Sequence, residues 1–250
     1  MKNSKREREI LDILHDQGYA SVEELADRIH ISQSSIRRDL ASLENKGIVQ
    51  RSYGGVELLI SDSANIPFKI RLSENRIKKK KIAETALAMI QNSSVIFCDG
   101  GSTTYYLIQL IPSIKGTTVV TNGVEALSFL AFSPTKTIST GGTVNPENRG
   151  ALIGDPVVNS WKSMRADIAF FSVQAIDSNG NMFFNYESEV PCAKAMLSSA
   201  KTKILLCDST KIGKTATYLL GTLSDIDIVI CDKDISNKYS EIYPNVKFIY

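Results

Sequence analysis

The sequence predicts an α/β protein in which a small, mainly helical N-terminal unit precedes a larger domain with a mostly parallel sheet. Three observations lead to this class. Apolar residues in the first 56 positions recur at helical spacing, six short apolar runs typical of buried strands follow beyond residue 90, and amphipathic segments lie between several of those runs. A chain of 250 residues has enough material for two such domains.

The N-terminal unit begins with two predicted helices. In "EREILDILHDQ", Ile10, Ile13 and Leu14 recur at helical spacing, and a glycine follows as a stop. The second helix lies in "SVEELADRIH", where Ser21 and Glu24 have the spacing of a capping box. Each segment has one apolar face, so we expect the two helices to share a small core.

A third helix and a hairpin complete this unit. Ser32 is a good N-cap for a helix that ends at Gly47. Beyond it, "IVQRSYGGVELL" alternates around a Gly-Gly turn and predicts a two-stranded ribbon. Three short helices followed by such a ribbon make a winged helix-turn-helix, which we assign to residues 1–56.

The remainder of the chain divides into a linker and the α/β domain. Residues 57–75 have no lasting period and contain Pro67, which predicts a linker. Residues 76–250 form the larger domain. Its predicted strands are "SVIFC", "TTVVT", "KTIST", "DIAFFSV", "KILLC" and "DIVIC", with helices in "KIAETALAMIQ" and "EVPCAKAMLSSA".

The third helix carries a polar face suited to DNA. At 100° per residue, its apolar residues Ile36, Leu40 and Leu43 fall on one side. The outward face of its first turns bears hydroxyl, amide and guanidinium groups, which reach phosphates and base edges from a helix in the major groove. The candidate DNA contacts on it are Gln33, Ser34, Ser35, Arg37 and Arg38, with Arg38 directed into the groove and Arg37 towards a phosphate.

Charge alone does not predict DNA binding, because residues 1–56 hold nine Lys or Arg and nine Asp or Glu. The arrangement of the charges does favour it. Arg51 and Tyr53 lie beside the Gly-Gly tip of the wing, to which Gly54 belongs, and we expect contacts to the DNA backbone there. Lys5, Arg6 and Arg8 crowd the start of the first helix, where the macrodipole disfavours cations, so an external phosphate is expected there as well.

The whole unit resembles the DNA-binding domain of DeoR-type bacterial transcriptional regulators. The shared features are the early Arg-Glu-Arg, "VEELA", the segment "ISQSSIRRDLASLENKG" and a wing of the form "R.YGG". Ser35 stands where the family usually has threonine, and Tyr53 where it usually has histidine. Both replacements keep a hydrogen-bonding group.

Polar residues at strand ends predict a ligand site in the second domain. In "VIFCDGGSTTYY" a strand passes through a Gly-rich turn into a helix. The N-terminus of such a helix favours binding of an anion. Because ligands of open parallel sheets bind outside the carboxyl ends of the strands, we expect several such ends to converge. The residues that we assign to the site are Asp99, Gly100, Gly101, Ser102, Thr103, Thr104, Thr121, Asn122, Gly141, Gly142, Glu189, Asp208 and Lys211.

This domain resembles the DeoR-type sensor domain, which is related in fold to ribose-5-phosphate isomerases and coenzyme A transferases. The corresponding stretches are "DGGSTT", "VTN", "TGG" and "DSTKIG". The resemblance implies a phosphorylated sugar as effector, with "DGGSTT" as its phosphate cradle. The segment before Met196 departs from the family in lacking its glycines and most of its basic residues, although it keeps Glu189 and Lys194. For the run Lys78–Lys81 we expect a solvated face rather than a phosphate contact.

The sequence therefore indicates a transcriptional regulator that binds double-stranded operator DNA and a phosphorylated sugar. Repression is the family expectation, and recognition of paired half-sites implies a homodimer or homotetramer. The alternative is a sugar-phosphate isomerase with a DNA-binding appendage, for which Asp99, Glu189 and Lys211 are the candidate proton-transfer groups. We expect no cofactor, no metal and no disulfide, since the four cysteines are far apart. With no signal sequence or spanning segment recognised, the expected location is the cytoplasm, away from membranes.

Overall fold

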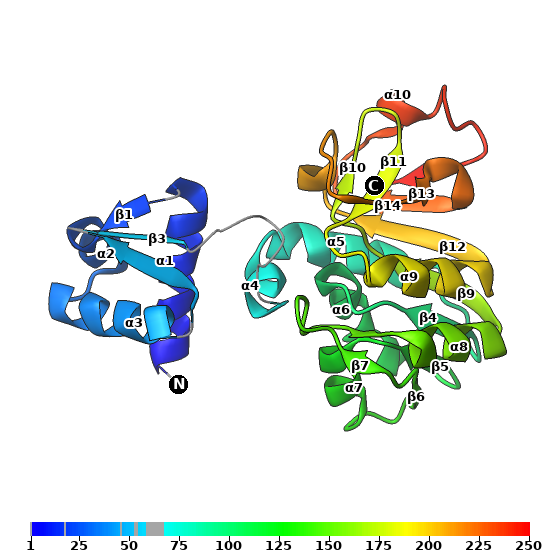
Figure 1. The fold of residues 1–250 in the computed structure, drawn as a ribbon, viewed down its shortest axis with the longest axis horizontal. Helices are drawn as coiled ribbons and strands as arrows, with labels where there is room; N and C mark the ends of the chain where they lie inside the picture. Colours follow the sequence, from blue (N-terminus) through cyan, green and yellow to red (C-terminus); the bar gives the residue numbers. More distant parts are fainter. Residues whose placement is uncertain (1, 18, 46, 53–54, 59–67) are drawn as a thin grey trace. The chain divides into compact units, whose positions relative to one another are not determined.

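The computed structural model describes residues 2–17, 19–45, 47–52, 55–58 and 68–250 (Figure 1). The chain forms two compact units, Met1–Glu74 and Asn75–Tyr250. The linker predicted at residues 57–75 contains regular structure at both ends, since strand β3 (Gly55–Leu58) enters it and helix α4 (Phe68–Ser73) lies in its second half. Helix α4 begins at the buried Phe68, directly after Pro67. The sequence did not predict this helix, because six residues are too few to show a helical period.

The first unit is a helix-turn-helix with a wing, as predicted. Its elements are α1 (Lys2–Gln17), β1 (Tyr19–Ser21), α2 (Val22–Ile29), α3 (Gln33–Asn45), β2 (Val49–Ser52) and β3. The unpredicted strand β1 pairs with β3, so the ribbon is a three-stranded antiparallel sheet in the order β1-β3-β2. A strand of three residues is too short to show a period in the sequence. The core consists mainly of Ile10, Leu14, Leu25, Ile36, Leu40, Leu43, Val49 and Val56.

Local capping interactions set the helix ends in this unit. The Ser21 hydroxyl accepts the backbone N–H of Glu24 at 3.1 Å, and the Glu24 carboxylate accepts the N–H of Ser21 at 2.8 Å, which confirms the capping box. After α3, Gly47 has a φ of +67°. Its N–H donates to the carbonyl of Glu44, and the N–H of Ile48 donates to that of Leu43. This is a Schellman ending, and it needs the left-handed conformation that glycine adopts without strain.

The second unit is built on a seven-stranded parallel sheet. In spatial order its strands are β15 (Lys247–Ile249), β14 (Ile228–Cys231), β12 (Ala200–Cys207), β9 (Ala166–Phe171), β4 (Val95–Cys98), β5 (Thr118–Thr121) and β6 (Lys136–Ser139). All six predicted strands are present, which confirms the fold class. The seventh, β15, is short and partly exposed, so the sequence did not distinguish it.

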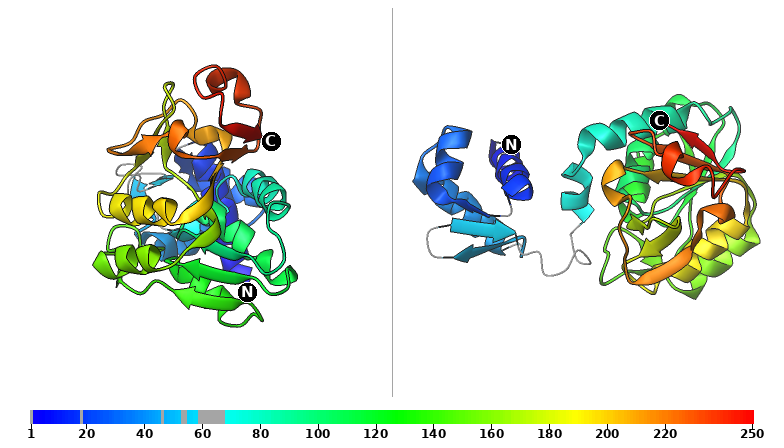
Figure 2. Two further views of the ribbon diagram at one scale, coloured as in Figure 1. Left: turned by 90° about the vertical axis from the view of Figure 1, so that its right-hand side faces the viewer. Right: turned by 90° about the horizontal axis from the view of Figure 1, so that it is seen from above.

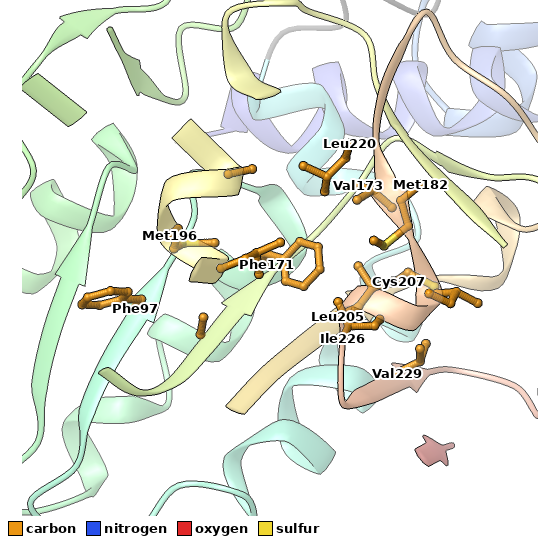
Figure 3. Close-up of a cluster of buried hydrophobic side chains, with 14 of the residues drawn as sticks. Phe97, Phe171, Val173, Met182, Met196, Leu205, Cys207, Leu220, Ile226 and Val229 are labelled. Atoms are coloured by element: carbon orange, nitrogen blue, oxygen red, sulfur yellow. The ribbon is translucent and has the colours of Figure 1, made fainter. Parts of the chain in front are cut away.

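Helices cover both faces of this sheet (Figures 1 and 2). The helices are α5 (Arg76–Leu87), α6 (Ser102–Ile108), α7 (Val124–Leu130), α8 (Asp155–Ser163), α9 (Glu189–Ser198) and α10 (Ser236–Tyr239). Phe97, Phe171 and Leu205 face the helices α8 and α9 in one core cluster, part of which Figure 3 shows. The alternate residues, such as Ile96 and Ile204, are buried on the other face, where α5 and α6 contact β12. Burial on both faces explains why the strands are nearly continuous apolar runs.

Two small antiparallel sheets complete the unit and were not predicted. One has the order β10-β11-β13, with β10 (Ala175–Ile176), β11 (Asn181–Phe184) and β13 (Tyr218–Thr222). The other pairs β7 (Thr143–Val144) with β8 (Leu152–Ile153). Among the described residues, no helix is long and apolar enough to cross a membrane.

The strand order contains a topological switch point. From β4 the chain adds β5 and β6 on one side, and then returns to place β9 and β12 on the other side. Adjacent crossover connections therefore leave in opposite directions between β4 and β9. In sheets of this kind, ligands bind outside the carboxyl ends of the strands at that point.

Candidate functional site

Polar residues directly follow five neighbouring strands of the sheet. In spatial order from β14 to β5 they are Asp232, Asp208, Ser172, Asp99 and Asn122. Because the strands are parallel, all five stand at the same edge. Three of them were predicted from the sequence. Ser172 and Asp232 were missed, although each is the first polar residue after an apolar strand, which was the feature used for the others.

Asp99 bridges the switch point. Its Oδ2 accepts the backbone N–H of Ser172 at 2.8 Å, and its Oδ1 accepts the N–H of Gly101 at 2.9 Å. The hydroxyl of Thr104 also donates to Oδ1. Burial raises the pKa of Asp99 above its ordinary value even though these hydrogen bonds and the charge of Lys211 act to lower it. The carboxylate therefore holds the Gly-rich turn against the end of the neighbouring strand β9.

A lysine of α5 reaches this turn. Lys79 is only 3% exposed, and its Nζ donates to the Ser102 hydroxyl at 3.1 Å. Lys78 donates to the hydroxyl of Ser209 at 3.2 Å, and Lys81 donates to the carbonyl of Asp232 at 3.1 Å. The prediction that the four lysines form a solvated face is therefore wrong for Lys79, which is buried, whereas Lys78 is half-buried and Lys80 and Lys81 are exposed. The sequence shows a run of identical residues and does not reveal which one turns inward.

Lys211 supplies a second cation. Its Nζ donates to the Ser172 hydroxyl at 3.0 Å. Asp208, only 1% exposed, lies near both cations. Burial acts to raise the pKa of Asp208, but the charge of Lys211, hydrogen bonds from Thr210 and the charge of Lys79 outweigh it, so the pKa is lowered. The structure thus brings Lys79, which was not predicted, together with the predicted pair.

The loop after Asp208 is held by the next strand end. The N–H of Ser209 donates to Asp232 Oδ1 at 2.6 Å, and its hydroxyl donates to Oδ2 at 3.0 Å. The N–H of Thr210 donates to Asp208 Oδ1 at 3.0 Å. These bonds order the short turn that carries Lys211.

Close backbone approach explains the glycines of the turn. A Cβ at Gly100 would lie 2.8 Å from the Cβ of Ala151 and 2.9 Å from the carbonyl oxygen of Gly150. A Cβ at Gly123 would lie 3.1 Å from the Cα of Gly100. The segment around Ala151 is therefore packed against the ends of β4 and β5, a contact between distant parts of the chain that the sequence did not indicate.

The end of β5 has an incompletely bonded amide. Asn122 donates from Nδ2 to the carbonyl of Leu152 at 2.9 Å, while its buried Oδ1 has no hydrogen-bond partner within the described part of the chain. The buried hydroxyl of Thr103 likewise has none there. Thr121, also predicted, uses its hydroxyl to accept the N–H of Gly123 at 3.0 Å, which is a structural role.

Glu189 forms a separate carboxylate–amide cluster. It is 8% exposed at the start of α9 and accepts hydrogen bonds from the side-chain amides of Asn148 and, at 3.5 Å, Asn145. Asn148 is connected to the Gly-rich turn through Ala151, whose N–H donates to its carbonyl at 3.1 Å. Neither asparagine was predicted, because both lie in an irregular segment without a recognisable motif.

The predicted glycines after β6 stand at the edge of the sheet, two strands beyond β4. Gly141 and Gly142 are exposed and have φ values of +68° and +107°. A Cβ at Gly142 would meet Val157 at 2.5 Å and the carbonyl of Ile153 at 2.6 Å, so this glycine serves close packing beside β8. Among the described residues, no hydrogen bond joins either glycine to the turn at Asp99.

The predicted DNA-facing residues of α3 are on its outer side. Gln33, Ser34, Arg37 and Arg38 are exposed, and Ser35 is half-buried. Their partners are local: Arg37 Nη2 donates to Gln33 Oε1 at 3.2 Å, and the Ser32 hydroxyl lies 3.0 Å from those of Ser34 and Ser35. The side chain of Arg38 forms no hydrogen bond or ion pair with any other described residue. It is therefore free to meet an external group.

The described part of the wing is bound to the end of α3. Arg51 is exposed; its N–H donates to Glu44 Oε1 at 3.2 Å, and its guanidinium lies 3.7 Å from Glu44 Oε2. Such an exposed pair is weak and can open for a phosphate. Tyr53 and Gly54 lie outside the described residues.

One expectation about α1 is wrong. Arg6 was assigned to an external phosphate, but its guanidinium is bound to Asp39 of α3. The sequence could not show this partner, which lies 33 positions along the chain.

Two family models match this chain, one in each of its two units. Residues 6–62 match the DeoR-like helix-turn-helix domain, and residues 74–233 match the DeoR C terminal sensor domain. The chain is 34% identical to the L-fucose operon activator of Haemophilus influenzae, over 94% of this chain and 96% of that protein. It is 29% identical to the glycerol-3-phosphate regulon repressor of Escherichia coli K12, over 93% and 92%.

Among solved structures, the chain is similar to ribose 5-phosphate isomerase from Plasmodium falciparum. The sequences are 18% identical, the match covers 54% of this chain and 52% of that one, and the TM-score is 0.40. This is a similarity of fold over about half of each chain. The two family matches together span nearly the whole described fold, from the helix-turn-helix to the strand ends. The chain therefore belongs to the DeoR family of transcriptional regulators.

Proposed function

We propose that this regulator binds operator DNA through α3 and the wing, and that a phosphorylated sugar bound at the strand ends of the second unit controls that binding. In this proposal Arg38 reads base edges, and Arg37, Arg51, Tyr53 and Gly54 contact phosphates. Gln33, Ser34 and Ser35 complete the face. The support is the exposure of this face opposite the buried Ile36–Leu43 side of α3.

The observation that carries the effector proposal is the pair of cations at the switch point. Lys79 and Lys211 each donate to a serine hydroxyl, Ser102 and Ser172 respectively, and both lie near the carboxylate of Asp208. A phosphate dianion would accept charge-assisted hydrogen bonds from both ammonium groups and from the hydroxyls. Asp208 keeps both cations in place before the ligand arrives.

The sugar would lie towards the other polar groups of the site. The unpartnered Oδ1 of Asn122 needs a donor, and the Thr103 hydroxyl can give or accept a hydrogen bond. Glu189, with Asn145 and Asn148, offers acceptors and donors for further hydroxyl groups. This arrangement suits a polyhydroxylated ligand with one anionic end.

Control requires that the effector bind two states of the protein with different affinity. We propose that residues 1–56 and 76–250 act as separate DNA-binding and sensing domains, with the segment between them carrying the change. We also propose a homodimer or homotetramer, because paired half-sites fit a symmetric protein. Repression is proposed as the direction of control on the likeness to the glycerol-3-phosphate regulon repressor; an activator is among the relatives too, so a reporter gene decides it.

A thermal-shift screen tests the effector proposal. Phosphorylated sugars, their unphosphorylated parents and inorganic phosphate are each added to the full chain. A phosphorylated sugar should raise the melting temperature and change operator retention in a gel-shift assay, whereas its parent sugar should do neither. Ser102→Glu puts a carboxylate beside Lys79 and should abolish both responses, with Ser133→Glu as a substitution outside the site. A full response in Ser102→Glu would place the phosphate elsewhere.

An isomerase activity is the second candidate, and the raised pKa of Asp99 is the observation that favours it, since a proton-transfer group benefits from such a shift. Incubation of the purified chain with sugar phosphates tests this activity directly. Turnover that is lost in Asp99→Asn would support an enzyme. Binding without turnover would support a sensor.

A further inference from the structure

Helix α1 is attached to the recognition helix α3 by two side-chain interactions. Arg6 donates to Asp39 from Nε at 2.9 Å and from Nη2 at 3.0 Å, a bidentate pair that joins residues 33 positions apart. The side chain of Asp39 is 1% exposed and that of Arg6 is 29% exposed. The Ser42 hydroxyl donates to Glu7 Oε1 at 2.8 Å. Two consecutive residues of α1 therefore bind α3 at points one helical turn apart.

The position of Asp39 makes these interactions relevant to DNA. It directly follows Arg37 and Arg38, whose side chains are exposed. On a helix, adjacent residues are 100° apart, so the direction of the Asp39 side chain determines the direction of Arg38. A planar guanidinium that bonds both carboxylate oxygens restrains rotation as well as distance. Apolar packing of α3 alone permits small rotations, because its buried side chains are not directional contacts.

We propose that Arg6 is a positioning residue for operator recognition: its bidentate pair with Asp39 sets the rotation of α3 about its own axis and thereby the aim of Arg38 at base edges. The proposal rests on the DNA-binding face of α3 described under the proposed function. It replaces the expectation that Arg6 itself holds a phosphate.

This role predicts a loss of discrimination with little loss of general attraction. Contacts to phosphates supply affinity for any duplex and determine its salt dependence, whereas contacts to base edges supply sequence preference. A misaligned Arg38 still attracts the DNA through its charge, but its guanidinium no longer meets the base edges at hydrogen-bonding geometry. Arg6→Lys is the informative variant, because it retains the charge at position 6 but cannot form the planar fork.

The experiment uses the full chain and a duplex selected from a random DNA library by the wild-type protein. Dissociation constants are measured for this duplex and for poly(dI-dC) over a series of salt concentrations. Arg6→Lys and Arg6→Gln should lower the ratio of the two affinities roughly tenfold or more. The slope of log affinity against log salt on poly(dI-dC) should change by less than about 0.9, the value of one lost phosphate contact.

Two further variants serve as a control and as a second test. Arg28→Lys makes the same substitution at an exposed arginine of α2 and should leave the ratio unchanged. Ser42→Ala removes the second interaction without touching a charge, and should lower the ratio by a smaller factor. Thermal unfolding of each variant sets an assay temperature at which it is folded, and Ser42→Ala decides the question if both Arg6 variants unfold.

Retention of the wild-type ratio in Arg6→Lys, or in Ser42→Ala where the Arg6 variants do not fold, would overturn the proposal. Equal weakening on both DNAs, with a slope lower by about 0.9, would also overturn it by making Arg6 a phosphate contact. A different result would show that α3 does not contact the DNA at all. In that case Arg38→Ala would retain the selected duplex as well as the wild type does.

Discussion

Asp99 and Ser172 are joined across the switch point of the sheet, where the Asp99 carboxylate accepts the backbone N–H of Ser172 at 2.8 Å. The two residues follow β4 and β9, neighbouring strands from which the chain leaves in opposite directions. The bond holds the Gly-rich turn and the serine that binds Lys211 in one arrangement.

Asp99→Asn should destabilise the protein by about 1–3 kcal/mol, because the new NH₂ group would face the N–H of Ser172 or of Gly101, leaving a buried donor without an acceptor. Urea unfolding measures the change. Asp155→Asn, at an exposed aspartate in the first turn of α8, is the matched control and should shift the midpoint little. Equal midpoints for Asp99→Asn and the wild type would mean that the bridge contributes no stability.

The two strand-end carboxylates should have opposite effects on stability as a function of pH. The pKa of Asp208 is lowered in the folded protein, so its contribution is present above its unfolded pKa of about 3.9 and is lost as the pH falls below it. The pKa of Asp99 is raised, so its contribution is full below about 3.9 and is lost as the pH rises through the folded value. Unfolding free energies of Asp208→Asn and the wild type, measured from pH 3 to 7 (~0.5-unit steps), should converge at the acid end.

Lys211→Met should raise the pKa of Asp208, since the charge of Lys211 helps to lower it. The acid loss of stability should then begin at a higher pH than in the wild type. An unchanged acid transition would show that Lys211 does not act on this carboxylate.

Lys79→Met should weaken binding of the phosphorylated effector about 10–100-fold, the effect of losing a hydrogen bond to a charged group. The melting temperature without ligand should fall modestly, because the buried Asp208 carboxylate keeps Lys211 but loses the charge of Lys79. Lys80→Met, at the exposed neighbour, is the control and should bind normally. A large drop in ligand-free stability with unchanged affinity would indicate that Lys79 is only structural.

Arg38→Ala should reduce operator affinity at least about tenfold while leaving the fold intact, since its side chain is exposed and lies opposite the buried face of α3. Gel-shift titration measures the affinity, and circular dichroism checks the fold. Arg28→Ala serves as the control for removal of a positive charge from the same unit. Near-normal retention of the operator by Arg38→Ala would contradict the orientation of α3 given above.

The four thiols should be unreactive towards a disulfide reagent in the folded protein and should all react after denaturation. All four cysteines are free and buried, so the reagent cannot reach them in the folded protein. Burial also raises the pKa of Cys98 and Cys192, whereas a hydrogen bond with Cys207 lowers the pKa of Cys231, which is protected by burial alone. Spectrophotometric titration of the released thiolate counts them. Rapid reaction of one thiol in the native protein would place that cysteine at an accessible position.

Local patterns in the sequence were sufficient for much of the fold and for part of the candidate site. Apolar periodicity marked α1, α2, α3, α5 and α9 and six strands of the parallel sheet, and the Ser21–Glu24 capping box formed as its spacing predicted. Asp99, Asn122 and Asp208 were found because a polar residue after a buried strand is visible in a few adjacent letters. Such features depend on interactions within a single turn or strand, so neighbouring residues determine them.

Tertiary structure decided what depends on the meeting of distant elements. Nothing local distinguishes Lys79 from Lys80, yet only one of them is buried, because α5 packs with that side chain towards Ser102. Likewise, the sequence predicted a phosphate contact for Arg6, whereas the packing of α1 on α3 brings its guanidinium against Asp39. The strand order that puts Ser172 beside Asp99 is also set by long-range pairing. A charged side chain acquires its role from the partner that folding brings within about 3 Å, and that partner is not encoded in its neighbours along the chain.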